Sequence, residues 1–309
     1  MTAFREITRG LKFPEGPVAM PDGSVVLTEI GAGTITRVHP DGRKEVVANT
    51  GGGPNGAAVG PDGKLYVCNN GGLKWHVENG TYRSIGQADD YKTGSLQRVD
   101  LATGKVETLY TECSGNRLCG PNDLMFDRQG GLWFTDYGKT RARDMDRGGI
   151  YWCKTDGSQI IEAMHPVLGP NGIGLSPDEK TLYIAETETS RCWSYSILGP
   201  GKLAREPFPS PNGGKLVAGI GGFQRFDSMA LEANGNICIA TLVRGGITVI
   251  SPDGSRTEHI PLPDLYVTNI CFGGPDLRTA FITLSYEGRL VAMDWPRPGL
   301  PLNFLNRKP

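Results

Sequence analysis

The sequence predicts an all-β protein, a six-bladed β-propeller with four-stranded blades. Three observations lead to this fold class: one phrase recurs six times, turn-forming residues are unusually common, and no segment shows the period of an amphipathic helix. Gly 44 and Pro 22 make 66 of 309 residues, about a fifth, where average usage is roughly 12%. Because 38% of the residues are hydrophobic, the composition indicates a packed core with many turns rather than disorder.

Each copy of the recurring phrase has an apolar stretch, a Gly/Pro/Asp turn and a second, β-rich stretch. The copies are FPEGPVAMPDGSVVLTE (13–29), GPNGAAVGPDGKLYVCN (53–69), GPNDLMFDRQGGLWFTD (120–136), GPNGIGLSPDEKTLYIAE (169–186), RFDSMALEANGNICIAT (225–241) and YVTNICFGGPDLRTAFITL (266–284). Two strands joined by a tight turn explain this pattern. The sequence therefore predicts six hairpins.

A second pair of strands follows several of these hairpins. These pairs are 34–40 with 43–48, 94–100 with 105–110, 149–154 with 159–163, and 246–250 with 255–260. Four strands per unit and six units predict a propeller. The last unit has a third strand at 288–295 but lacks a fourth, and the N-terminal segment 3–8 fits as that outer strand. A ring closed in this way is one domain over 1–309, with a Pro-rich C-terminal tail at 296–309.

Charge and cysteine content exclude several classes of protein. Lys+Arg 32 against Asp+Glu 33 leaves a net charge of -1, which argues against a nucleic-acid partner. The first ten residues lack the apolar segment of a secretory signal, and no stretch is apolar enough to span a membrane. Seven cysteines without a CxxC pair favour a reducing, cytoplasmic location. Cys113 and Cys119 are close enough in sequence to pair, although packing in the core is the expected role of most cysteines.

One polar residue recurs at the start of the first strand in every repeat. We call this set the first ring: Glu15, Asn55, Asn122, Asn171, Asp227 and Asn269. Since the first strand of each propeller blade lines the central channel, these side chains are expected to converge near the axis. Carboxylate and carboxamide oxygens suit a hard cation such as Ca²⁺, and none of the four histidines joins the set. The alternative is that these residues only form turns with their own backbone.

A second set recurs about 14 residues later, where the hairpin returns to the same face. We call it the second ring: Glu29, Asn69, Asp136, Glu186 and Thr241. Asn69 and Asp136, together with Asn122 of the first ring and Tyr137, are candidates for contacting a substrate. The competing interpretation is that second-ring residues are polar strand ends.

Three phrases carry a resemblance to a known family. They are Glu15-Gly16-Pro17, the PNGI of 170–173 with the following LSPD of 175–178, and FDSMALEANGNICIA at 226–240. These phrases resemble the senescence marker protein/gluconolactonase family, also called regucalcin-like, of six-bladed propeller hydrolases. The resemblance extends over nearly the whole chain as repeats in order.

The resemblance implies a site and an activity. It implies that Glu15, Asn171 and Asp227 bind one divalent metal ion, Ca²⁺ in the first instance, with Zn²⁺, Mg²⁺, Mn²⁺ or Fe²⁺ as alternatives. It also implies that Asn122 supplements the metal or contacts substrate, and that Asp227 is the general base. The implied reaction opens a small-molecule lactone, such as an aldonolactone, to its hydroxy acid by attack of water.

Two other functions stay open at this point. The same scaffold resembles diisopropyl fluorophosphatase, which implies a phosphotriesterase-like hydrolase, and a propeller with a structural calcium ion could serve as a non-catalytic scaffold. The insertion 71–93, with Trp75, His76, Tyr82 and Tyr91, is either a wall over the site or a solvent loop or subunit contact. Nothing in the sequence indicates an oligomeric state.

Overall fold

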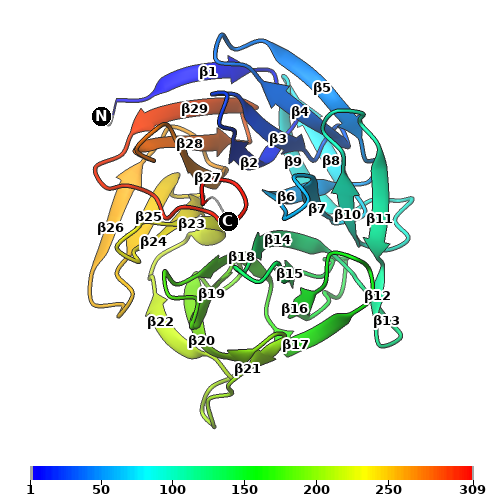
Figure 1. Ribbon diagram of the computed structural model, residues 1–309, viewed down its shortest axis with the longest axis vertical. Coiled ribbons are helices and arrows are strands. Elements are labelled where there is room, and N and C mark those ends of the chain that lie inside the picture. The colour runs from blue at the N-terminus through cyan, green and yellow to red at the C-terminus, as the bar shows by residue number, and fades with distance from the viewer. Residues whose placement is uncertain (1–2, 308–309) are drawn as a thin grey trace.

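The computed structural model describes residues 3–307, and six of its sheets are blades arranged around a central channel, with two further two-stranded sheets outside them (Figure 1). The first three blades contain β2 (Pro14–Ala19), β3 (Val25–Glu29), β4 (Thr34–Val38) and β5 (Lys44–Asn49); β6 (Pro54–Val59), β7 (Leu65–Asn69), β10 (Ser95–Val99) and β11 (Val106–Tyr110); and β14 (Pro121–Phe126), β15 (Leu132–Asp136), β16 (Gly148–Cys153) and β17 (Ile160–Val167). The expected all-β propeller is confirmed, and no helix occurs within residues 3–307.

The remaining blades follow the same plan. They contain β18 (Pro170–Leu175), β19 (Thr181–Glu186), β20 (Arg191–Gly199) and β22 (Lys215–Gly219); β23 (Arg225–Leu231), β24 (Ile237–Leu242), β25 (Gly246–Ile250) and β26 (Thr257–Pro261); and β27 (Val267–Gly273), β28 (Thr279–Leu284), β29 (Arg289–Asp294) and β1 (Arg5–Arg9). β1 pairs antiparallel with β29, so the N-terminal strand completes the last blade as the strand count predicted. The short β21 (Lys202–Leu203) pairs with β20 beside this frame.

The first strand of every blade carries one extra residue opposite its neighbour. This β-bulge lies at the start of each innermost strand, for example between Glu15 and Val18 in β2 and between Phe226 and Met229 in β23. A bulge bends the strand and redirects a side chain. In five blades the irregular segment begins at or includes the first-ring residue, and in β27 it lies immediately before Asn269.

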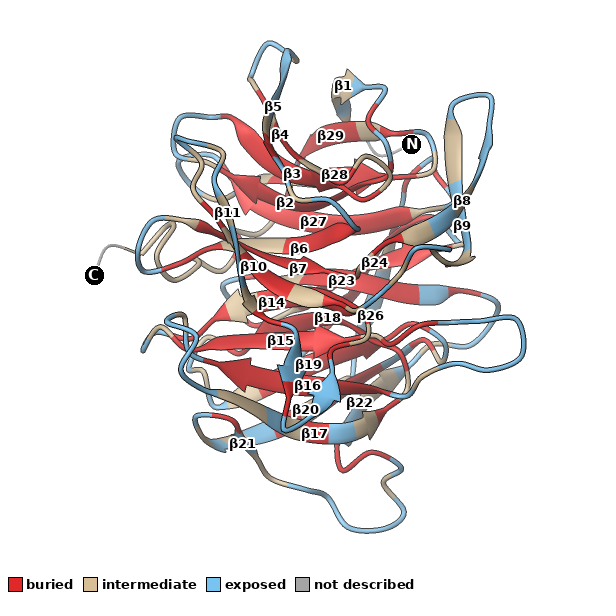
Figure 2. Cartoon of the chain, turned by 90° about the vertical axis from the view of Figure 1, so that its right-hand side faces the viewer, coloured by how far each residue is buried: buried red, intermediate tan, exposed pale blue. Residues whose placement is uncertain are grey.

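The core lies between neighbouring blades. The second strands β3, β7 and β15 are buried at every residue, whereas the outer strands β5 and β26 are largely exposed (Figure 2). A strand buried on both faces needs a continuous apolar run rather than alternation. This explains why VVL, LYV and LWF recur in the sequence.

The insertion 71–93 contains a hairpin, which was not predicted. Its strands are β8 (Leu73–Glu78) and β9 (Thr81–Gln87), and a further short hairpin pairs β12 (Glu112–Cys113) with β13 (Asn116–Arg117).

All seven cysteines are free thiols, so Cys113 and Cys119 do not form the disulfide that their spacing in the sequence would allow. The described residues include no helix long and apolar enough to cross a membrane.

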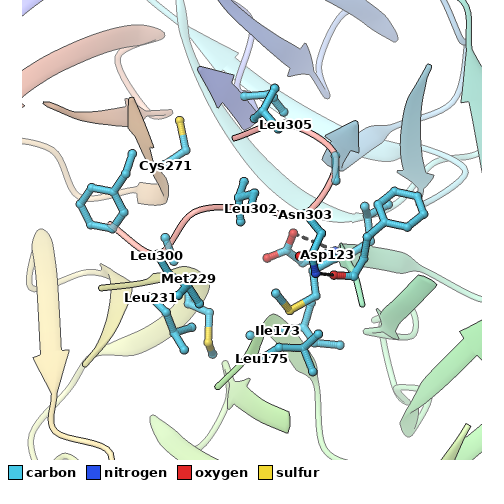
Figure 3. Close-up of a pocket in the computed structure, with 18 of the residues that line it drawn as sticks. Asp123, Ile173, Leu175, Met229, Leu231, Cys271, Leu300, Leu302, Asn303 and Leu305 are labelled. Atoms are coloured by element: carbon cyan, nitrogen blue, oxygen red, sulfur yellow. Dashed lines mark hydrogen bonds between the residues drawn. The ribbon is translucent and has the colours of Figure 1, made fainter. Parts of the chain in front are cut away.

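The C-terminal tail closes one end of the channel. Leu300 N donates to Leu231 O at 2.8 Å, and Asn303 Nδ2 donates to Phe126 O at 3.0 Å, so the tail spans from the fifth blade to the third. Figure 3 shows Leu300, Leu302 and Leu305 facing a cavity of about 110 Å³ between the first strands. Residues 308–309 of the predicted tail lie outside the described residues. The opposite end of the channel, where β8 and β9 project, is the mouth (Figure 2).

Candidate functional site

The first-ring residues lie where neighbouring first strands approach one another closely. A Cβ added to Gly16 would lie 2.4 Å from Asn55 O, and one added to Gly172 would lie 2.6 Å from Asp227 O. Adjacent first strands thus approach so closely that the residue after the ring position has no room for a side chain in these blades. This contact explains the recurrent Glu-Gly and Asn-Gly pairs.

Threonines from the second strands hold the first-ring backbone in place. Thr28 Oγ1 donates to Asn55 O at 2.7 Å, and Thr135 Oγ1 donates to Asn171 O at 2.6 Å. Both bonds cross from one blade to the next. They satisfy buried carbonyl groups that the bulges remove from the regular ladder.

Glu15 is buried and receives two hydrogen bonds on the same oxygen. Gly16 N and Asn269 Nδ2 each donate to Glu15 Oε2 at 2.7 Å. Burial nevertheless raises the pKa of Glu15 to about 7, because these two bonds compensate only part of the lost hydration. The second oxygen, Oε1, is the one available to a ligand.

Asp227 is also buried, and its hydrogen bonds compensate only part of the hydration that its carboxylate loses. Ser228 N donates to Asp227 Oδ1 at 3.1 Å, which leaves Oδ2 for another partner. Burial and the negative charge of Glu15 raise the pKa of Asp227 well above its usual range. Asn171 Nδ2 donates to Thr187 Oγ1 at 3.1 Å, and this bond fixes the orientation of the neighbouring carboxamide.

Two first-ring carboxamides have an oxygen with no partner. Asn55 Oδ1 and Asn122 Oδ1 are both buried and accept no hydrogen bond. A buried unsatisfied acceptor costs about 1–3 kcal/mol, so native proteins rarely retain one without a reason. Two such oxygens at equivalent ring positions indicate a site built for a ligand that supplies positive charge or a proton donor.

Asp123 is a third carboxylate at the channel that the sequence reasoning did not single out. It follows Asn122, at the position that glycine occupies in three other blades. Burial and the charge of Glu15 raise the pKa of Asp123 to about 8, and its charge in turn adds to the raised pKa of Asp227. Glu15, Asp123 and Asp227 therefore interact electrostatically although they come from the first, third and fifth blades. An alignment of the six repeats would have shown a charged residue, Asp123, at a position where three other repeats have glycine.

The donor set fits a hard divalent cation. It combines two buried carboxylates, from Glu15 and Asp227, with the free carboxamide oxygen of Asn122 and the oriented amide of Asn171. Within residues 3–307, no three His, Cys, Asp or Glu side chains form a metal-binding group. Carboxamide oxygens would therefore have to complete the coordination of any cation held here.

The second ring has another role in the structure. Asp136 accepts bonds from Cys119 N and Gly120 N at 2.6 Å, and from Gly138 N at 2.9 Å. Asn69 Oδ1 accepts from Gly53 N and Gly71 N, each at 2.9 Å. These bonds fix the loop that leads into the first strand of the same blade, and they support the structural interpretation of Asp136 and Asn69 over substrate contact.

Tyr137 belongs to a cluster of polar side chains. Its hydroxyl donates to Glu188 Oε1 at 2.7 Å, and Arg225 Nη2 lies 3.2 Å from Glu188 Oε2. Burial raises the pKa of Tyr137, and the charges of Glu188 and Asp227 add to this shift. Tyr137, Glu188 and Arg225 therefore form a polar cluster within electrostatic reach of Asp227. The sequence reasoning selected Tyr137 but missed Glu188 and Arg225, which lie outside the repeated ring positions.

The fold and the site together define a six-bladed β-propeller with an oxygen-lined site at one mouth of its channel. The sequence profile described as SMP-30/Gluconolactonase/LRE-like region matches residues 13–286. The chain therefore belongs to the SMP-30/gluconolactonase/LRE-like family.

Individual relatives agree with this family. The chain is similar to the gluconolactonase of Zymomonas mobilis, with 27% identity over 93% of this chain and 80% of the relative. It is 28% identical to diisopropyl-fluorophosphatase of Loligo vulgaris, over 96% of this chain and 93% of the relative. A solved structure of regucalcin, a calcium-binding protein from Agrobacterium tumefaciens, superposes with a TM-score of 0.74 at 19% identity, over 99% of this chain and 98% of that one, and shows the shared fold.

Proposed function

We propose that this protein is a divalent-cation-dependent lactonase that hydrolyses a sugar-acid lactone to its hydroxy acid. The observation that carries the proposal is the first ring, where Glu15 and Asp227 are buried beside carboxamide oxygens without a partner. Family membership and the named lactonase relatives support the reaction class. Ca²⁺ is the first choice of cation, because all available donors are hard oxygens.

Glu15, Asn122, Asn171 and Asp227 would hold the cation. When bound, a divalent cation supplies the positive charge that keeps the two carboxylates ionised and polarises the lactone carbonyl group. The Asn171 carboxamide is held at both ends, because its Nδ2 donates to Thr187 Oγ1 at 3.1 Å and its Oδ1 accepts from Ser228 Oγ at 3.4 Å. Its Oδ1 would contact the cation through its second lone pair.

Asp227 is the proposed general base. Its Oδ1 is occupied by Ser228 N, so Oδ2 accepts the proton from the attacking water. The bond between the carbonyl carbon and the ring oxygen breaks, and the ring oxygen takes up the proton that Asp227 accepted from water, which gives the hydroxy acid and restores the carboxylate. Asn122 and Tyr137 are the proposed substrate contacts, since one offers a neutral amide and the other a hydroxyl close to Asp227.

The test compares Asp227→Ala with the wild-type protein on a panel of sugar lactones. Loss of a general base and cation ligand should lower kcat by at least about 100-fold, while the circular dichroism spectrum stays unchanged. Removing divalent cations with a chelator should abolish turnover, and adding Ca²⁺ should restore it. A variant that opens lactones at nearly the wild-type rate would falsify the role of Asp227.

Phosphotriester hydrolysis is a second candidate, favoured by the similarity to diisopropyl-fluorophosphatase over nearly the full length of both chains. A fluorophosphate substrate belongs in the same panel. A folded, cation-binding protein that turns over neither substrate class would instead favour a non-catalytic calcium-binding scaffold.

A further inference from the structure

Hairpin β8–β9 has one apolar and one charged face. Trp75 is on the same strand as His76 and points to the opposite side, because side chains alternate along a strand. Val77 pairs with Tyr82 across the hairpin, and His76 pairs with Arg83. The face with Trp75 and Tyr82 is partly covered, whereas His76 and Arg83 are exposed.

The apolar face of the hairpin continues into a row of aromatic rings at the mouth. The ring centroids of Trp75 and Tyr82 are 5.7 Å apart, and those of Trp75 and Phe13 are 5.0 Å apart. Phe13 in turn lies 6.0 Å from Tyr266, whose ring is 5.8 Å from Tyr286. The row joins an insertion of the second blade to the first and sixth blades. We call these five residues the aromatic wall.

Phe13 anchors the wall beside the first ring. It lies two residues before Glu15 and has a φ of +54°, an unusual conformation for a bulky residue. Glu29 Oε2 accepts a bond from Lys12 N at 2.6 Å, and Ile30 N donates to Phe13 O at 3.1 Å. A second-ring carboxylate thus helps to hold Phe13 in this strained position, where Trp75 packs on it.

The mouth therefore has two chemically different sides. The aromatic wall lies on the first and sixth blades, next to Glu15 and Asn269. Tyr137, Glu188 and Arg225 lie on the third, fourth and fifth blades, near Asp227. A six-membered sugar ring has the matching division, since its C–H bonds form an apolar face and its hydroxyl groups are polar.

We infer that Trp75 is a specificity-determining residue that stacks on the C–H face of a six-membered sugar lactone, while the hydroxyl groups of that sugar face the polar cluster. This inference rests on the proposed lactonase function and adds the residue that selects the size and hydroxylation of the lactone. It assigns the insertion 71–93 a role in substrate selection. Aromatic side chains suit this task because they present a large rigid surface with little conformational freedom to lose.

Kinetics of Trp75→Ala and Trp75→Phe test the inference on two substrates. Gluconolactone is large enough to reach the aromatic wall, whereas γ-butyrolactone is a small ring without hydroxyl groups. Trp75→Ala should raise KM for gluconolactone roughly tenfold with kcat changed less than about twofold, and should leave KM for γ-butyrolactone nearly unchanged. Trp75→Phe should restore most of the affinity, and His76→Ala, on the charged face of the same strand, is the matched control. An equal rise of KM for both lactones, or no rise, would overturn the inference.

Fluorescence provides a readout that does not depend on turnover. Of the five tryptophans, Trp133, Trp152, Trp193 and Trp295 are buried and only Trp75 is partly exposed. Gluconolactam, a ring amide that resists hydrolysis, should change the wild-type emission and have no effect on Trp75→Phe. Binding of the lactam by a protein inactive on every lactone would support the role of Trp75 and refute the lactonase proposal. No change in wild-type emission at millimolar lactam would refute the role of Trp75.

Discussion

Asn269 Nδ2 donates a hydrogen bond of 2.7 Å to Glu15 Oε2, which joins the last blade of the propeller to the first at the level of the first ring. The two residues are 254 positions apart in the chain. The bond lowers the pKa of Glu15 against the larger effect of burial, so it favours the carboxylate that a cation requires.

Asn269→Ala should weaken cation binding. Without the Nδ2 donor the ionised form of Glu15 loses a hydrogen bond to a charged group, which is worth about 1.5–3 kcal/mol. Titration calorimetry with Ca²⁺ should therefore show a dissociation constant raised by roughly tenfold or more. Asn49→Ala, on the exposed outer strand β5, should bind Ca²⁺ like the wild type. If both variants bind equally well, Glu15 does not depend on Asn269.

Stability should depend on pH in a direction set by the buried carboxyls. Burial raises the folded-state pKa of Glu15 to about 7 and of Asp123 to about 8, whereas both titrate near 4 when unfolded. Their protonated forms therefore favour the folded state. This contribution is complete below about pH 4 and is lost as pH rises through 7 and 8.

Thermal unfolding of cation-free protein measures this effect. The Tm should fall between pH 5 and pH 8, and Ca²⁺ should raise the Tm more at pH 8 than at pH 5. Asp123→Asn keeps an acceptor for Leu124 N, which donates to Asp123 Oδ1 at 2.9 Å, and it should flatten the pH dependence. A cation-free Tm that rises over this pH range would contradict the proposed electrostatics.

Asp136→Ala should impair folding rather than substrate binding. The variant leaves three backbone N–H groups of the loops at 119–120 and 138 without an acceptor, and loss of such a network costs about 3–5 kcal/mol. Urea denaturation should show this loss of stability, while KM of the folded fraction stays within about twofold of the wild type. A stable variant with a large rise in KM would return Asp136 to the substrate site.

Arg297→Ala should destabilise the C-terminal closure of the channel. Arg297 Nε donates to Glu232 Oε2 at 2.5 Å, and Glu232 is fully buried, where it also accepts Trp295 Nε1 at 2.7 Å. Removing the arginine leaves a buried carboxylate without its cation, which costs about 3 kcal/mol. Differential scanning calorimetry should record the lower Tm, and Arg297→Ala with Glu232→Gln should recover part of it. An unchanged Tm in the single variant would show that Trp295 and Asn236 alone satisfy Glu232.

Local pattern in the sequence was sufficient for the propeller and for the first ring. Each hairpin is a contiguous segment with its own turn, and every copy of the phrase has a polar residue at the position that Asn171 occupies in the fourth copy. The polar ring could therefore be predicted by aligning the repeats with one another. The closure by β1 could also be predicted, because one blade lacked a strand and the N-terminus supplied it.

Contacts between blades were decided only by the tertiary structure. The electrostatic interaction of Asp123 with Glu15, the packing of Trp75 on Phe13 and the entry of Leu300 into the channel all join segments that no repeat relates. The period of a blade determines which residues face the axis. The axis-facing residues that contact one another across the channel are determined by how the six blades close into a ring and how the loops and the C-terminal tail pack on it. These are long-range contacts, which local propensity does not determine.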